Sequence, residues 1–346
     1  MVFLESLLRE ATAAFLDEEC TFAPAVGGVN NSTYFLTRPS GERLVLRIYN
    51  NGNDRSRVRY EHAVLSALRA QPLPFCVPIA LPARGSGLPH AELSSGAEAA
   101  LFELIPCSLP GLGCARAIGA ASGALAAVLA TVLAGLDHLE SPQAPYYDLY
   151  DMHHATKACG REGFLQAVAR PEMDGVRASM DFLVAQIAVV EAAVGAARCE
   201  GDGLPMGLIH GDLHYDNVLV TPDGVVSGLL DFEFCARDLR AMELAICLSK
   251  YCGEAEPAPY LTDFISGYCS TCYRLTAVEA RAVPTLVVLR IVSNIVFFVG
   301  RALAGEDEWL QLTSRAENYA KRVRWLGGHG AWISEQIVAA TPAAAT

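Results

Sequence analysis

One segment near the middle of the chain constrains the fold more than any other. Residues 210–217 read His-Gly-Asp-Leu-His-Tyr-Asp-Asn, and two short apolar runs follow at 218–221 and 225–230. The runs are separated by a Pro-Asp-Gly sequence, so they predict a β-hairpin. Because a hairpin returns the chain to its starting point, we expect Asn217 and Asp231 to lie near each other.

The polar residues of this segment have a spacing suited to phosphoryl transfer. Asp212 and Asn217 form Asp-x-x-x-x-Asn, the spacing of a kinase catalytic loop, in which Asp accepts a hydroxyl proton and Asn binds magnesium. Asp231 supplies a second acidic group. Mg²⁺ prefers oxygen ligands and usually binds through one or two carboxylates together with phosphate oxygens. The pattern therefore predicts a site for a nucleotide triphosphate and Mg²⁺.

Two other interpretations of the same segment are open. His-Gly-Asp and Asp-Phe-Glu are also ordinary turn residues beside a hairpin. Alternatively, His210, Asp212 and His214 alternate, so an extended segment would present their nitrogen and oxygen atoms to a zinc ion from one face. The zinc interpretation leaves Asn217 and Asp231 without a role.

Composition sets broader limits on the class of protein. With 346 residues, 52% of them hydrophobic, the chain is long enough to form two lobes with buried cores. A net charge of -12 disfavours a nucleic-acid partner, because nucleic-acid-binding domains usually carry a basic surface. Residues 1–10 lack the basic start of a secretory signal, and the eleven cysteines show no disulfide framework. We therefore expect a cytoplasmic protein.

Two apolar stretches have the length of a membrane span. Residues 118–136 are dominated by small side chains, which contribute little transfer free energy. Residues 284–300 are interrupted by Arg290, Ser293 and Asn294. We expect both stretches to be buried helices and expect no association with a membrane.

The periodicity of apolar residues divides the chain into two parts. An N-terminal lobe should occupy residues 1–106 and a larger, helical lobe residues 107–338, followed by a disordered tail over 339–346. The elements expected in the first lobe are helices over 3–16 and 57–70 and strands over 31–37, 43–49 and 99–105. Around the 210–233 segment, the second lobe should contain helices over 238–251, 260–272, 277–304 and 308–337.

Taken together, these features resemble the aminoglycoside phosphotransferase superfamily, closest to its homoserine kinase type II and choline or ethanolamine kinase-like branches. The resemblance rests on residues 208–217 and 230–233, and less specifically on the glycine- and amide-rich stretch 26–34. It implies an α+β, protein-kinase-like fold with a small β-rich N-terminal lobe and a larger, mostly helical C-terminal lobe. It also implies ATP-dependent transfer of the γ-phosphoryl group to a hydroxyl of a small molecule.

The resemblance implies roles for individual residues of the catalytic centre. Asp212 would be the catalytic base or would position the acceptor hydroxyl, and Asn217 and Asp231 would bind Mg²⁺. Arg47, on the third strand, would hold the α and β phosphates of ATP. Glu61, on the following helix, would be the ion-pair partner of Arg47.

Further residues would bind the rest of the nucleotide. The loop residues that would approach the phosphates are Gly28, Asn30, Asn31 and Ser32. Glu103 and Ile105 would lie in the segment between the lobes, against which adenine packs and forms hydrogen bonds with the backbone.

The chain departs from the family pattern at one position. The usual lysine of the third strand is absent, and no lysine occurs before Lys157. An arginine stays charged and can bind phosphate oxygens through two nitrogens, so Arg47 is able to replace the lysine. The alternative for Arg47 is a solvent-exposed charge on an edge strand. The missing lysine is also the only support for a second hypothesis, a catalytically silent nucleotide-binding protein that regulates a partner.

The identity of the acceptor is the least constrained property. The resemblance favours a homoserine-like amino acid or an amino alcohol, with an aminoglycoside or sugar hydroxyl as the alternative. His153 and His154 lie in a polar, aromatic stretch that could line the substrate pocket, and His214 could contact substrate. No feature of the sequence indicates an oligomeric state.

Overall fold

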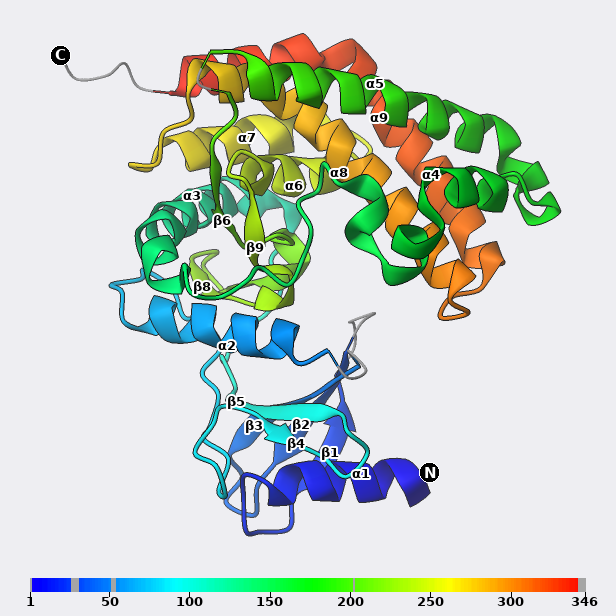
Figure 1. The fold of residues 1–346 in the computed structure, drawn as a ribbon. Helices are drawn as coiled ribbons and strands as arrows, with labels where there is room; N and C mark the ends of the chain where they lie inside the picture. Colours follow the sequence, from blue (N-terminus) through cyan, green and yellow to red (C-terminus); the bar gives the residue numbers. More distant parts are fainter. Residues whose placement is uncertain (1, 26–30, 51–53, 202, 342–346) are drawn as a thin grey trace.

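The N-terminal part of the computed structural model is a five-stranded antiparallel sheet with the strand order β1-β2-β3-β5-β4 (Figure 1). The structure describes residues 2–25, 31–50, 54–201 and 203–341. The sheet strands and their two flanking helices are α1 (Val2–Ala13), β1 (Thr21–Pro24), β2 (Ser32–Thr37), β3 (Arg43–Tyr49), α2 (Ser56–Arg69), β4 (Ala91–Glu92) and β5 (Glu98–Glu103).

Strand β3 divides its side chains between the two faces of the sheet. Successive side chains of a strand point to opposite faces. Leu44, Leu46 and Ile48 are buried in the apolar cluster that also contains residues of α1. Arg47 points to the other face, toward α2. In Figure 1, α2 lies between the sheet and the C-terminal helices, so Arg47 faces the junction of the two lobes.

The C-terminal part is built mainly from helices around the long, apolar helix α8 (Figure 1). Helix α8 begins with a capping box formed by Thr276 and Glu279, and its buried side chains pack against α4, α5, α6 and α9. The helices are α3 (Ala115–Val132), α4 (His154–Val168), α5 (Arg177–Cys199), α6 (Met242–Tyr251), α7 (Pro257–Cys269), α8 (Ala277–Leu303) and α9 (Trp309–Ala340). Short 3₁₀ helices between them are η1 (Leu112–Cys114), η2 (Leu133–Leu136), η3 (Leu149–Met152), η4 (Pro171–Val176), η5 (Tyr215–Asn217) and η6 (Phe232–Phe234).

Two small antiparallel strand pairs lie where the helical part meets α2. The hairpin predicted from the sequence is present as β7 (Val218–Val220) and β8 (Val226–Leu229). A second pair, β6 (Met206–Ile209) with β9 (Ala236–Leu239), brackets this hairpin. The chain therefore leaves β6, forms the loop that contains Asp212, passes through the hairpin and returns beside β6.

The two-part α+β architecture and most of the expected elements are confirmed. The short edge strands β1 and β4 and the β6–β9 pair were not predicted. The first helix ends at Ala13 rather than residue 16, and α9 continues to Ala340, two residues into the expected tail. The lobe boundary at residue 106 stays a prediction.

Three helical stretches of the described chain are long and apolar enough to cross a membrane, by length and composition alone. They are Leu112–Leu136, Pro171–Cys199 and Ala277–Leu303. The first and third contain the two stretches considered in the sequence, and 50% and 61% of their apolar windows are buried inside the structure. That burial fits core helices, and the absence of membrane association stays a prediction.

The backbones of α3 and α7 approach so closely that no side chain fits at Gly119. A Cβ atom at Gly119 would lie 2.1 Å from the carbonyl oxygen of Phe264, which belongs to a rigid helix backbone. We expect Gly119→Ala to lower the free energy of unfolding by about 1–3 kcal/mol, the usual cost of overpacking, as measured by urea denaturation.

The matched control is Gly327→Ala in α9, where a Cβ atom would meet nothing within 4 Å. This substitution should raise stability by up to about 1 kcal/mol, because alanine is the better helix former. Equal stabilities of the two variants would show that α3 and α7 do not approach as closely as described.

Candidate active site

The loop between β6 and β7 places Asp212 in a cleft between the two lobes. Gly211 precedes it with φ of +83°, and a Cβ atom there would lie 2.2 Å from the carbonyl oxygen of Phe234. Only glycine fits this position without strain. The hydroxyl of Tyr146 donates to the Gly211 carbonyl at 2.6 Å. The loop is therefore fixed on both sides of Gly211.

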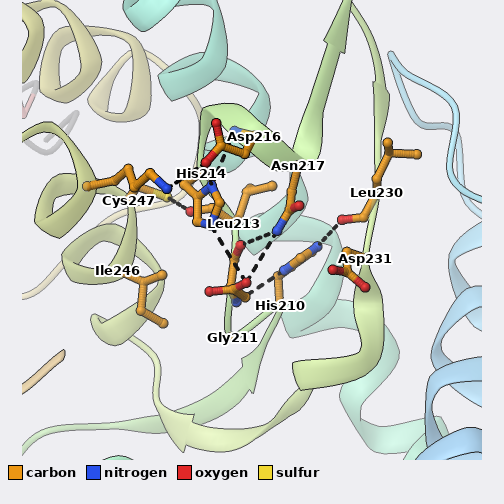
Figure 2. Close-up of polar contacts among 12 residues, drawn as sticks. His210, Gly211, Leu213, His214, Asp216, Asn217, Leu230, Asp231, Ile246 and Cys247 are labelled. Atoms are coloured by element: carbon orange, nitrogen blue, oxygen red, sulfur yellow. Dashed lines mark hydrogen bonds and ion pairs between the residues drawn. The ribbon is translucent and has the colours of Figure 1, made fainter. Parts of the chain in front are cut away.

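His210 is a structural residue at the base of this loop. Its side chain is fully buried, its Nδ1 accepts from the Asp212 backbone N–H at 3.3 Å, and its Nε2 donates to the Leu230 carbonyl at 2.9 Å (Figure 2). Burial, partly offset by Asp212, lowers the pKa of His210, so the imidazole is neutral. Because both ring nitrogens are occupied, the zinc interpretation of His210, Asp212 and His214 is wrong.

A buried carboxylate, Glu243 of α6, holds the loop from the opposite side. Its Oε2 accepts from the His210 backbone N–H at 2.6 Å, and its side chain is 1% exposed. Burial raises the pKa of Glu243 to about 7, although the backbone N–H groups of His210 and Gly211 oppose this shift. The Cys247 thiol, one helical turn further along α6, donates to the Leu213 carbonyl at 2.9 Å.

Asp212 forms an ion pair with Arg290 of α8. Arg290 Nη2 lies 2.6 Å from Asp212 Oδ1, and Arg290 Nη1 donates to Asn294 Oδ1 at 2.6 Å. His214 Nε2 lies 3.6 Å from the other carboxylate oxygen, Oδ2. Burial opposes ionisation, but the contact with His214 and the charge of Arg290 lower the pKa of Asp212 to about 2. Asp212 is therefore an anion at neutral pH.

Asn217 and Asp231 lie side by side at the open end of the hairpin, as predicted. The Leu230 N–H donates to the Asn217 carbonyl at 2.9 Å, which closes the hairpin next to both residues. The Asn217 amide donates to the Asp212 carbonyl at 2.8 Å, so its Oδ1 points elsewhere (Figure 2). Asp231 has φ of +66°, the one positive φ of a non-glycine residue in the described chain. Such strained residues cluster at functional sites.

The donor atoms at this position fit a divalent cation of the hard class. Asp231 Oδ1 is buried and lacks a hydrogen bond among the described residues, although Arg47 Nη2 lies 3.1 Å away. Asp231 and Asn217 both line the cleft. Oxygen-only donors of this kind suit Mg²⁺ or Ca²⁺ rather than zinc.

Arg47 joins three elements of the structure. Its Nη1 lies 3.1 Å from Glu61 Oε1 on α2, and its Nη2 lies 3.1 Å from Asp231 Oδ1 after β8. The expected Arg47–Glu61 ion pair is thus present, and Arg47 is not an exposed edge charge, since its side chain is 15% exposed. Burial lowers the pKa of Arg47, but the charges of Asp231 and Glu61 raise it more, so the guanidinium stays charged.

Only part of the expected nucleotide loop falls within the described residues. Gly28 and Asn30 lie outside them. Asn31, just before β2, donates through Nδ2 to Glu233 Oε2 at 2.6 Å and so links the two lobes. Ser32 begins β2, and its hydroxyl accepts from the Asn50 side chain at 3.4 Å.

The expected adenine-binding segment lies at the end of β5. The Glu103 N–H is bonded to the Ile79 carbonyl at 2.9 Å, and Ile105 packs against Gly228 of β8. Leu109, further along the connection, lines the cleft, whereas Glu103 and Ile105 do not. Their contact with adenine stays a prediction.

The cleft has a volume of about 600 Å³ and reaches from Arg47 to α8 and α9. Its lining includes residues that were not assigned a role from the sequence: Arg290, Ser293, Asn294 and Phe297 of α8, and Arg315 and Tyr319 of α9. One sequence signal was available, because Arg290, Ser293 and Asn294 recur at helical spacing within an apolar stretch. They form a polar stripe that faces the cleft.

His153 and His154 are separate from the cleft lining. His153 is buried, caps α4 by accepting from the Ala155 N–H, and lies 3.5 Å from Glu306. Atoms of His153, His154 and Glu306 lie within 4.8 Å of one another, but Arg301 pairs with the same Glu306 carboxylate at 3.2 Å. His214 does line the cleft, next to Asp212.

The chain is similar to known proteins in sequence and in fold. A model described as the phosphotransferase enzyme family matches residues 21–281. A homoserine kinase of Acidiphilium cryptum (strain JF-5) is 31% identical over 296 residues, which are 83% of this chain and 84% of that protein.

Two solved structures share the fold at lower identity. A microcompartment-associated aminopropanol kinase has a TM-score of 0.71 and 17% identity, covering 95% of this chain and 98% of that one. An amicoumacin kinase in complex with AMP-PNP and Ca²⁺ has a TM-score of 0.66 and 14% identity, covering 92% of each chain.

The buried carboxylate of Glu243 predicts a pH-dependent contribution to stability. Its pKa is about 7 in the folded chain and near 4.5 when exposed, so the folded state binds more protons between these values. Stability from this group is present below about pH 4.5 and is lost as pH rises toward 7, at up to about 1.4 kcal/mol per pH unit. Glu243→Gln should flatten the pH dependence of urea unfolding in this range. Glu317→Gln, at an exposed position of α9, is the control and should leave the pH dependence of unfolding as it is in the wild type. Equal pH slopes for the two variants would contradict the raised pKa of Glu243.

Removing Arg47 should leave a buried, unpaired Glu61. We expect Arg47→Met to lower the free energy of unfolding by about 3–5 kcal/mol, and the further change Glu61→Gln to restore part of it. A double-mutant cycle on the exposed Arg281–Glu200 pair, whose side chains are both 57% exposed, is the control and should give a coupling below about 1 kcal/mol. Equal coupling in the two cycles would mean that Arg47 and Glu61 are not a buried pair.

Proposed function

We propose that this chain, which belongs to the phosphotransferase enzyme family, is a kinase for a small amino acid and that homoserine is the favoured acceptor. Enzymes of the family transfer a phosphoryl group to hydroxyl acceptors, so the chain is a small-molecule kinase. The preference for homoserine is supported by similarity to a homoserine kinase along 83% of the chain.

The observation that carries the proposed mechanism is the half-buried, ionised Asp212 beside the side chains of Asn217 and Asp231. Its Oδ1 is held by Arg290 at 2.6 Å, whereas Oδ2 has only longer contacts, with Asn217 Nδ2 at 3.4 Å and His214 Nε2 at 3.6 Å, so Oδ2 is the oxygen that would accept a hydrogen bond from the acceptor hydroxyl. The hydroxyl oxygen forms a bond to the γ-phosphorus while the bond from that phosphorus to the bridging oxygen breaks, and ADP leaves. Phosphoryl transfer of this kind depends mainly on positioning and charge stabilisation.

The low pKa of Asp212 decides its role within this reaction. A carboxylate with a pKa of about 2 is a weak base, so it does not remove the hydroxyl proton before attack. It orients the hydroxyl and takes the proton late, once the oxygen has become acidic by bonding to phosphorus. Arg290 keeps Asp212 ionised and in place throughout.

Kinases of this family use ATP with a divalent cation, and we propose Mg²⁺ for this chain. Asn217 and Asp231 would hold it through their side-chain oxygens. The bound cation would offset negative charge on the phosphates. Arg47, which already pairs with Asp231, would bind the α and β phosphates in place of the usual lysine, so its presence argues against the silent regulatory alternative.

Replacing Asp212 should separate turnover from nucleotide binding. With MgATP and L-homoserine, Asp212→Asn should lower kcat about 10²–10⁴-fold, the usual contribution of a positioned acid or base, while the KM for ATP changes little. ADP release, followed across hydroxylated amino acids, amino alcohols and aminoglycosides, provides the measurement.

Asp223→Asn, in the exposed turn of the hairpin, is the matched control and should keep wild-type turnover. Normal turnover by Asp212→Asn would contradict the assigned role. Wild-type activity on another acceptor class alone, still dependent on Asp212, would preserve the kinase and reject homoserine.

A further inference from the structure

One face of α9 brings cationic and phenolic side chains to the part of the cleft that is distant from Arg47. Arg315, Tyr319 and Arg322 are spaced by four and three residues, which places them on the same side of a helix. All three line the cleft that also contains Asp212. The face belongs to the C-terminal part of the chain.

The other cations of the cleft are already paired with carboxylates. Arg47 pairs with Glu61 and Asp231, Arg290 with Asp212, and Lys250 with Asp216 at 2.5 Å. These interactions account for the positive charge around the catalytic loop.

Arg315 differs from these cations. Within the described part of the chain, its guanidinium has no hydrogen bond and no carboxylate oxygen within 4.0 Å. The group lies over the Phe298 ring at 3.6 Å, which fixes its plane. The pKa of Asp307 is lowered chiefly by its hydrogen bond with Arg301 and also by the charge of Arg315. Both carboxylate oxygens of Asp307 are hydrogen-bonded to Arg301, at 2.8 and 2.9 Å. A half-buried guanidinium without a carboxylate partner among the described residues thus lines the cleft.

Arg322 adds a second positive charge to the same face of α9, although its own donors are partly used within the protein. Its Nε donates to Asn318 Oδ1 at 2.6 Å, and its Nη1 donates to the Ser249 carbonyl at 3.2 Å. It also has no carboxylate partner within 4.0 Å among the described residues. The α9 face therefore has two guanidinium groups that form no ion pair within 4.0 Å with any carboxylate of the described residues.

We propose that Arg315, supported by Tyr319 and Arg322, binds the carboxylate of the phosphoryl acceptor. A planar guanidinium matches a carboxylate through two parallel hydrogen bonds. The same positive face disfavours acceptors whose only charge is an ammonium group. This inference rests on the proposed kinase function and adds the reason for its substrate class: the enzyme selects hydroxylated amino acids over amino alcohols.

Two acceptors that differ only in the carboxylate test the inference. L-Homoserine and 3-amino-1-propanol share the hydroxyl, the amine and the chain between them. We expect calorimetric titration of the AMP-PNP-loaded protein to show at least about tenfold tighter binding of L-homoserine, from a charge-assisted hydrogen-bond pair. Arg315→Gln should lose about 10- to 100-fold in affinity for L-homoserine, with affinity for 3-amino-1-propanol and AMP-PNP unchanged.

Two further variants separate charge from structure. Arg315→Lys retains the positive charge but not the planar group that can form two parallel hydrogen bonds, so it should bind L-homoserine with intermediate affinity. Arg324→Gln is the matched control, because Arg324 also lies on α9 over an aromatic ring, Phe182 at 4.7 Å, but does not line the cleft. It should bind both acceptors as the wild type does.

Three outcomes would overturn the inference. These are equal binding of the two acceptors by the wild type, full L-homoserine affinity in Arg315→Gln, or loss of AMP-PNP affinity in Arg315→Gln, which would place a phosphate at Arg315.

Measurement of ADP release distinguishes failure of this inference from failure of the proposed function. If L-homoserine binds through Arg315 but is not phosphorylated, the carboxylate site is supported and the kinase reaction on homoserine is rejected. If only amino alcohols are phosphorylated, in a reaction that depends on Asp212, the kinase reaction is supported and the carboxylate site is rejected.

Discussion

The buried ion pairs of Arg47 are the interaction on which the geometry of the cleft depends. One guanidinium connects β3, α2 and the residue that follows the β7–β8 hairpin, through Glu61 and Asp231. Burying charge is costly unless every charge has a partner, so these elements are stable in few other arrangements. The sheet is thereby set against the helical part at the point where a nucleotide would bind, and Asn31 with Glu233 adds a second connection across the same junction.

A second buried network holds the loop of residues 210–217 against the helical part. Glu243 accepts from the backbone of His210, His210 donates to Leu230, and Tyr146 donates to Gly211. Glu243 Oε2, the His210 side chain and the Gly211 carbonyl are all hydrogen-bonded in this network, as burial favours, whereas Glu243 Oε1 has no hydrogen-bond partner among the described residues. The two networks meet at Leu230 and Asp231. The side chains of Asp212 and Asp231 are thus positioned by hydrogen bonds and ion pairs within the protein.

The sequence predicted what local patterns encode. The hairpin, the proximity of Asn217 to Asp231 and the Arg47–Glu61 pair follow from short-range spacing and from resemblance. The β6–β9 pair, the support from Glu243 and the ion pair of Arg290 with Asp212 join positions far apart in the chain, which periodicity does not reveal. The zinc interpretation failed because spacing alone does not show that both nitrogens of His210 are occupied. The polar stripe containing Arg290 was visible in the sequence, but its partner was not.

The most direct test of the account is the identity of the phosphorylated product. We would follow the wild-type protein with MgATP and L-homoserine by ³¹P NMR. The account predicts loss of the γ-phosphate signal of ATP and growth of a phosphate monoester resonance, split by the adjacent CH₂ group, in equal amount to ADP. Conversion of the γ-phosphate to inorganic phosphate alone, or no change with L-homoserine or with any other hydroxyl acceptor, would contradict it.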